Sequence, residues 1–152
     1  MGYWRMQLHP AQPEEAVKHS VTSLAAGYIG LDFGEDVGDL LRLKKADLPE
    51  GYQDYWDFAH TMKPGDQVLI IAHHFPFALA RVAGPYNYIS RSLPHIGVWF
   101  RHFRQVDSIS YFADFLTNAH DWPALKMTDA ISPLYDHDSK SYQLIEEWLG
   151  AA

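Results

Sequence analysis

Residues 63–88 read KPGDQVLIIAHHFPFALARVAGPYNY, and this stretch decides the fold class. It holds two short apolar runs, at residues 67–72 and 77–83, with turn-forming residues before, between and after them. Runs of this length that are rich in branched and aromatic residues, and bounded by Gly, Pro and Asp, are typical of buried strands. The stretch therefore predicts two neighbouring strands of a small sheet.

The flanking sequence adds helices and further strands. Strands are predicted at residues 3–8, 28–31 and 98–106, and helices at 13–26, 51–62, 107–116 and 139–149. Asp107-Ser108 is a suitable N-cap for the third helix, and residues 121–138 have the composition of a loop. This order predicts an α+β domain, a small curved sheet or barrel surrounded by helices, in a single unit spanning residues 1–152.

The composition excludes several classes of protein. The chain has 152 residues, no Cys and a net charge of -7, and 47% of its residues are hydrophobic. Without Cys there is no disulfide framework, thiolate nucleophile or Cys-ligated zinc. No apolar run approaches the roughly 20 residues needed to cross a bilayer, and the start of the chain lacks a signal-peptide pattern. We therefore expect a cytoplasmic protein with no membrane partner.

The charges are unevenly distributed along the chain. Residues 67–106 contain no acidic residue and four arginines, Arg81, Arg91, Arg101 and Arg104, so the flanks together carry a charge of -11. The same forty residues hold seven aromatic side chains. Arginines bind phosphates and aromatic rings stack on bases, so this segment is suited to a nucleic-acid strand in spite of the acidic total.

Motifs for catalysis are missing. No Gly-x-Ser-x-Gly elbow and no phosphate-binding glycine loop occurs. Successive residues of a strand point to opposite faces, so His73 and His74 would not chelate a metal together unless the loop bends. The run Asp136-His137-Asp138 lies in a polar turn, where such residues are commonly solvated or capping groups. We expect no catalytic residue, metal or cofactor.

Three short motifs, taken in order, resemble the PUA-like superfamily, specifically its EVE and YTH-like branch. They are KPGDQVLI at residues 63–70, ALARVAGPYNY at residues 78–88 and LPHIGVW at residues 93–99. The loop Ile29-Gly30-Leu31-Asp32-Phe33-Gly34 is similar to the Ile-Gly-Trp loop of that branch. The likeness covers residues 3–106, and residues 107–152 form a C-terminal helical extension outside it.

The resemblance implies a reader of modified bases. Similar domains hold an extruded base in an aromatic cage and serve modification-dependent restriction proteins of the McrB type. It implies a base pocket formed by loop residues and rings: Asp32, Phe33, Trp56, His73, His74, Phe75 and Tyr88. Phe33 would replace the loop Trp, and Arg81, Arg91, Arg101 and Arg104 would contact phosphates. A fused or separate motor or nuclease subunit is the implied partner.

Two other interpretations remain open. The same fold could be an RNA-binding module for a tRNA or another structured RNA. A barrel of this kind could also bind a small molecule or act as a metal-dependent enzyme through His73, His74 and Asp138.

Overall fold

The computed structural model describes residues 2–8, 13–32, 36–72, 75–91, 93, 100–112 and 130–151, without the side chains of 13–17, 75 and 151. Its strands are β1 (Tyr3–Met6), β2 (Tyr28–Leu31), β3 (Gln67–Ala72), β4 (Phe75–Val82), β5 (Asn87–Tyr88), β6 (His102–Tyr111) and β7 (Ile131–Pro133). Its helices are α1 (Pro13–Ala26), α2 (Gln53–Trp56) and α4 (Lys140–Ala151). Two 3₁₀ turns, η1 (Leu40–Arg42) and η2 (Lys45–Asp47), precede α2, and a π-helical turn, η3 (Asp57–Thr61), continues it. The predicted α+β class is confirmed.

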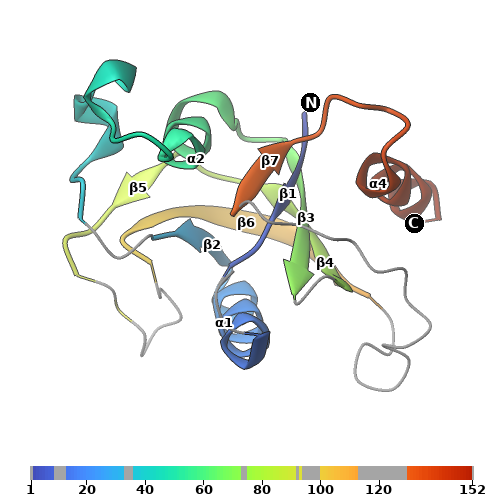
Figure 1. Ribbon diagram of the computed structural model, residues 1–152. Helices are drawn as coiled ribbons and strands as arrows, with labels where there is room; N and C mark the ends of the chain where they lie inside the picture. The colour runs from blue at the N-terminus through green and yellow to red at the C-terminus, as the bar shows by residue number, and fades with distance from the viewer. Residues whose placement is uncertain are drawn as a thin grey trace.

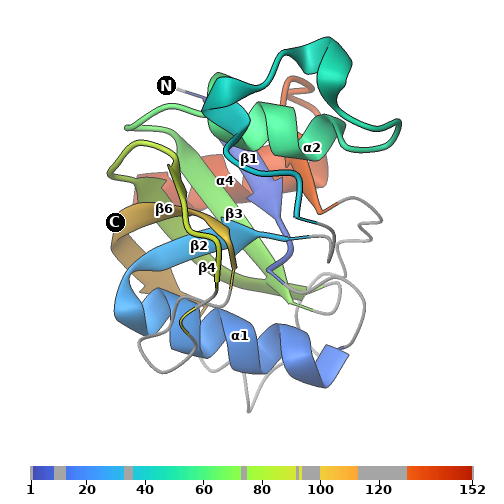
Figure 2. The same cartoon turned by 90° about the vertical axis from the view of Figure 1, so that its left-hand side faces the viewer.

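The strands form one strongly curled, half-barrel mixed sheet in the order β2-β6-β4-β3-β1-β7, with β5 paired to β6 (Figure 1). β1 and β3 are parallel, and the other described pairs are antiparallel. Helix α1 runs below the curled sheet, whereas α2 and its flanking turns lie above it (Figure 2). Within the described ranges, no helix has the length and apolar character needed to cross a membrane.

Strand β3 is buried on both faces, which explains its unbroken apolar sequence. Val68, Ile70 and Ala72 face the main core inside the curl. Leu69 and Ile71 face a second, smaller core that Ile145 of α4 completes from outside. Helix α4 therefore covers the outer surface of the sheet beside β1 and β3.

The turn at residues 63–66 fixes β3 against β1. Gly65 has a φ of +96°, a conformation that favours glycine, and its N–H donates to the Val82 carbonyl at 2.8 Å. The Asp66 carboxylate accepts hydrogen bonds from the Gly2 N–H (2.9 Å), the Trp4 indole N–H (2.9 Å) and the Lys63 N–H (3.0 Å). Asp66 therefore ties the start of β1 to the start of β3, and Gly65 ties the same turn to the end of β4.

Two predicted elements are wrong. Residues 107–111 belong to β6 and do not begin a helix, because Asp107 pairs with Arg81 and Ser110 with Leu79 across the sheet. Ser108 takes up a register shift there with a positive φ of 49°. Residues 131–133, predicted as loop, form β7 along β1. The C-terminal extension therefore contributes strands to the sheet as well as helix α4.

Gly30 provides a test of the packing at the edge strand β2. A Cβ atom at Gly30 would lie 2.3 Å from the Phe100 ring, so Gly30→Ala is expected to lower the free energy of unfolding by about 1–3 kcal/mol. Gly150→Ala in α4 is the matched control, because its Cβ meets no atom within 4 Å. It should leave stability unchanged or raise it by about 0.5–1 kcal/mol. Urea denaturation measures both, and equal stabilities for the two variants would contradict this account.

Candidate functional site

Polar and aromatic side chains converge where β2 and β5 flank the start of β6. Leu31 of β2 and Tyr88 of β5 both pair with His102 of β6, from its two sides. Asp32 follows β2 directly and Arg101 precedes β6. We call Asp32, Asp36, Tyr88, Arg101 and His102 the β6 cluster.

An arginine held by carboxylates forms the outer part of the β6 cluster. Arg101 donates from Nε and Nη2 to the two oxygens of Asp32, each at 2.7 Å, and Asp36 lies 3.8 Å from Nη1. Tyr88 donates its hydroxyl to both oxygens of Asp36, at 2.7 and 2.8 Å. The bond from Tyr88 lowers the pKa of Asp36, and the bond to Asp32 raises the pKa of Arg101. The group is therefore charged and geometrically fixed at neutral pH.

His102 forms the inner part of the β6 cluster. Its side chain is fully buried, and its ring contacts those of Tyr55, Tyr86 and Tyr88 at centroid distances of 4.6, 5.9 and 5.3 Å. The His102 Nδ1 lies 2.6 Å from the Tyr86 hydroxyl, which also accepts the Leu40 N–H at 3.2 Å. The remaining ring nitrogen, Nε2, is buried without a hydrogen-bond partner among the described residues. Burial lowers the pKa of His102 to about 4, so the imidazole is neutral at pH 7.

Arg104 is a structural residue, which corrects its predicted role as a phosphate contact. It is 3% exposed. Its guanidinium donates to the carbonyls of Phe58, Ala59 and Met62, at the end of η3, and to that of Gly84. Burial lowers the pKa of Arg104 to about 10, which leaves it charged at neutral pH. A group held in this way does not reach a phosphate at the surface.

Two of the other predicted arginines, Arg81 and Arg91, lie at the surface. Arg81 forms a bidentate ion pair with Asp107, at 2.8 and 2.9 Å, and both side chains are nearly half exposed. Arg91 is exposed. Exposed ion pairs are screened by solvent and contribute little to stability.

The structure brings only some of the predicted pocket residues together. Asp32 and Tyr88 meet in the β6 cluster, where they are joined by Arg101, which was predicted as a phosphate contact. Trp56 ends α2 and stacks on His60, with ring centroids 3.8 Å apart. Phe75 begins β4, where its backbone pairs with Ala72. Phe33, His73 and His74 lie outside the described residues.

The sequence analysis missed Asp36 and His102 as members of the site. Neither residue has a local signal in the sequence, because His102 is brought to the cluster by the pairing of β6 with β2 and β5, and Asp36 by its bond with Tyr88. Asp138 lies in an exposed turn, where its N–H donates to Asp136. Among the residues with described positions, no group of three or more His, Asp or Glu side chains is placed to hold a metal ion.

Substitutions of Arg104 and Arg81 compare how much a buried and an exposed arginine contribute to stability. Arg104→Met leaves the carbonyls at the end of η3 without their donor, and should lower the free energy of unfolding by about 3 kcal/mol or more. Arg81→Met removes only an exposed, solvent-screened ion pair and should change the free energy of unfolding much less. Urea denaturation at pH 7 measures both values. Similar losses in the two variants would be inconsistent with a structural role for Arg104.

The lowered pKa of His102 predicts that the folded protein loses stability in acid. Its pKa is about 4 in the folded protein and about 6.5 when unfolded, so between these pH values the unfolded state binds the extra proton. Stability should therefore fall by up to about 3 kcal/mol as the pH drops from 6.5 to 4, and this contribution should level off below pH 4. Denaturation midpoints of the wild type and His102→Gln over this range measure the difference. Parallel pH profiles would refute the assignment.

Comparison with known proteins leaves the family of the chain open. No protein-family profile matches the sequence, and no curated protein is significantly similar to it.

Proposed function

We propose that the chain is a non-catalytic nucleic-acid-binding domain of the PUA-like type that recognises a methylated or hydroxymethylated base. In this proposal the base is flipped out of the strand and held against the β6 cluster. The supporting observation is the cluster itself, which combines an aromatic side chain, two carboxylates and an arginine at the ends of three strands. The ordered motif resemblance in residues 3–106 points in the same direction.

The chemistry of the β6 cluster suits the edge of a base. Tyr88 is half-buried, so part of its ring remains available for stacking. Carboxylates accept hydrogen bonds from exocyclic amines, and arginine donates to ring nitrogens and carbonyl oxygens. Asp32 already binds Arg101 through both oxygens, whereas Asp36 is 37% exposed, so Asp36 is the better acceptor for a base amine. Stacking contributes about 1–3 kcal/mol per base, which offsets the few kcal/mol that flipping costs.

The strand backbone would be held by the exposed arginines. Arg81 and Arg91 are exposed, and the Arg101 side chain is 18% exposed. The acidic total of -7 keeps non-specific affinity low, so the base contact would decide where the protein stays. In this role the domain would serve as the specificity module of a cytoplasmic modification-dependent restriction system, with a motor or nuclease on the same chain or as a separate subunit.

Binding of matched oligonucleotides tests this function. Duplexes carrying 5-methylcytosine, 5-hydroxymethylcytosine or 6-methyladenine should include at least one that binds about tenfold or more tighter than the unmodified duplex, measured by fluorescence anisotropy. The same sequences as RNA, at matched salt, form a second arm. Equal weak binding to all duplexes would contradict the proposal, and tighter binding to RNA would establish the RNA-binding alternative in its place.

Variants of the β6 cluster connect the affinity to the site. Tyr88→Ala should remove most of the preference for the modified duplex, a loss of about 1–3 kcal/mol, because it deletes the stacking ring. Tyr111→Ala is the matched control, since Tyr111 is a 49% exposed tyrosine at the other end of β6. Arg91→Ala should weaken modified and unmodified duplexes equally and lower the salt slope by about one. If the Tyr88→Ala protein keeps its preference for the modified duplex, the base does not bind at the β6 cluster.

A further inference from the structure

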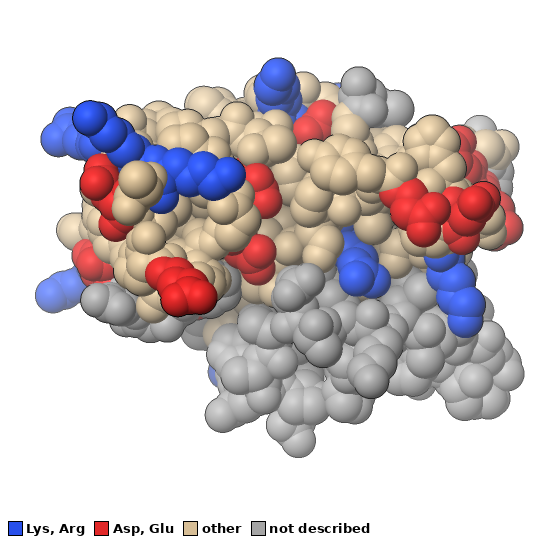
Figure 3. All heavy atoms as spheres, turned by 45° about the horizontal axis from the view of Figure 1, so that its top comes forward, with Lys and Arg blue, Asp and Glu red and all other residues tan. Residues whose placement is uncertain are grey.

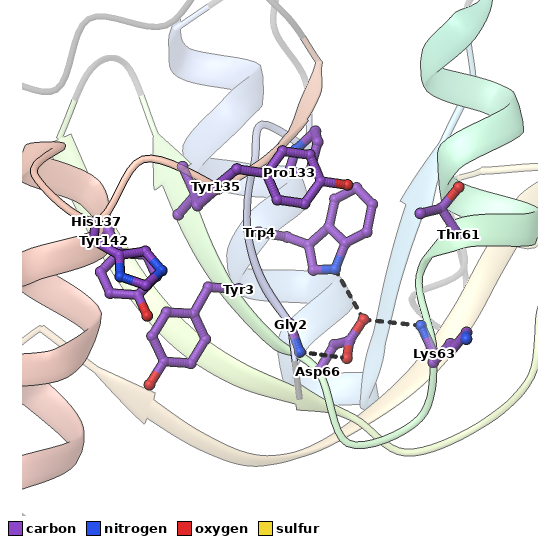
Figure 4. A pocket seen from close by; sticks show the side chains of 11 residues that line it. Gly2, Tyr3, Trp4, Thr61, Lys63, Asp66, Pro133, Tyr135, His137 and Tyr142 are labelled. Atoms are coloured by element: carbon purple, nitrogen blue, oxygen red, sulfur yellow. Dashed lines mark hydrogen bonds between the residues drawn. The ribbon is translucent and has the colours of Figure 1, made fainter.

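A cavity of about 480 Å³ lies between the start of β1, the end of β7 and α4 (Figure 4). None of its lining residues belongs to the β6 cluster. Its walls come from β1, from the turn that follows β7, from α4, and from the segment between η3 and β3. The proposed base site therefore makes no use of this cavity.

Aromatic rings dominate the walls of the cavity. Trp4 is 3% exposed and is anchored by its indole bond to Asp66. Tyr142 contacts Tyr3 at 4.9 Å and stacks on His137 at 4.4 Å, with 18° between the ring planes. Tyr135 also lines the cavity and is 77% exposed. The walls thus combine the buried Trp4 and the half-buried Tyr3 and Tyr142 with two exposed rings, Tyr135 and His137.

The surroundings of the cavity are acidic. Asp66 lines it, and Glu146 accepts the Tyr3 hydroxyl at 2.8 Å. Burial and the bond to Glu146 raise the pKa of Tyr3 to about 12, so this wall holds a neutral phenol beside a carboxylate. Residues 134–150 carry four exposed acids, Asp136, Asp138, Glu146 and Glu147, against Lys140. Figure 3 shows acidic side chains gathered at the α4 end of this face, while Lys63 is the basic residue in the lining.

We propose that this cavity binds an arginine side chain presented by a partner protein. Faces of aromatic rings attract cations, and the flat guanidinium stacks on them with a smaller loss of hydration than an ammonium group. Asp66 is 7% exposed and already accepts three hydrogen bonds, so it would act on a bound cation through its negative charge and not as a free acceptor. The acids of residues 134–150 repel phosphates and attract a cation, so the charge selects a basic protein segment over a nucleic-acid strand.

Comparing the affinity for arginine with that for citrulline, its neutral isostere, tests the proposal directly. N-acetyl-arginine methylamide and the corresponding citrulline compound are titrated into the ¹⁵N-labelled protein, and the Trp4 indole N–H resonance is followed because this group borders the cavity. We expect the arginine compound to shift this resonance with saturation, and the citrulline compound to bind at least about fivefold more weakly. No saturable shift with arginine, or equal affinity for the two compounds, would overturn the proposal.

Variants of the lining locate the bound arginine and separate the contribution of the aromatic ring from that of the negative charge. Tyr135→Ala should weaken arginine binding about two- to fivefold, and Glu146→Gln should weaken arginine but not citrulline. Leu41→Ala, a 56% exposed residue of η1 outside the lining, is the control and should change neither. Arginine affinity that is unchanged in both Tyr135→Ala and Glu146→Gln would place the arginine elsewhere. Binding of the modified duplex is measured on the same variants and should not change.

Discussion

One buried guanidinium connects the parts of the molecule on which the site depends. The Arg104 side chain projects from β6 and donates to three carbonyls at the end of the α2–η3 helical segment and to the Gly84 carbonyl before β5. The last carbonyls of a helix have no hydrogen-bond partner within the helix. A cation at this end therefore stabilises the helix both by donating hydrogen bonds to these carbonyls and by interacting with the helix dipole. Because α2 is held over β6 in this way, its Tyr55 ring reaches His102. The inner wall of the β6 cluster is therefore a consequence of the Arg104 contacts.

Local sequence was sufficient where short-range chemistry decides the structure. The bounds of β2 and β3, the end of α1 at Gly27 and the last helix α4 follow from apolar runs and turn residues. The local sequence was insufficient where contacts with residues distant in sequence determine the structure. Asp107-Ser108 has the composition of a helix cap, but pairing with Arg81 of β4 extends the strand through it. Arg104 is one of four arginines in an acid-free segment, and nothing in its neighbours distinguishes it from Arg81, because its acceptors lie 20 to 46 residues away.

The site was predictable in part for the same reason. Asp32 and Tyr88 were identified from loop position and motif order, and the structure connects them through Arg101 and Asp36. That connection runs across β2, β6 and β5, so no spacing in the sequence reports it. His102 was hidden for a different reason. A buried histidine with one open nitrogen looks, in sequence, like any residue at the start of a strand.

The charges around the two proposed sites affect how strongly each would attract a phosphate backbone. In the acid-free segment, Arg101 forms ion pairs with Asp32 and Asp36, and the buried Arg104 donates hydrogen bonds to carbonyls. Few surface cations of this segment therefore remain to bind a phosphate backbone. Weak backbone attraction makes affinity depend on the base itself, and a base reader needs this dependence in order to ignore unmodified strands. On the side of α4, the excess of acids disfavours the same backbone and favours a basic protein segment. The acids on the side of α4 would repel a phosphate backbone, and the lining of the cavity shares no residue with the β6 cluster, so in these proposals a strand and a protein partner would not compete for one site.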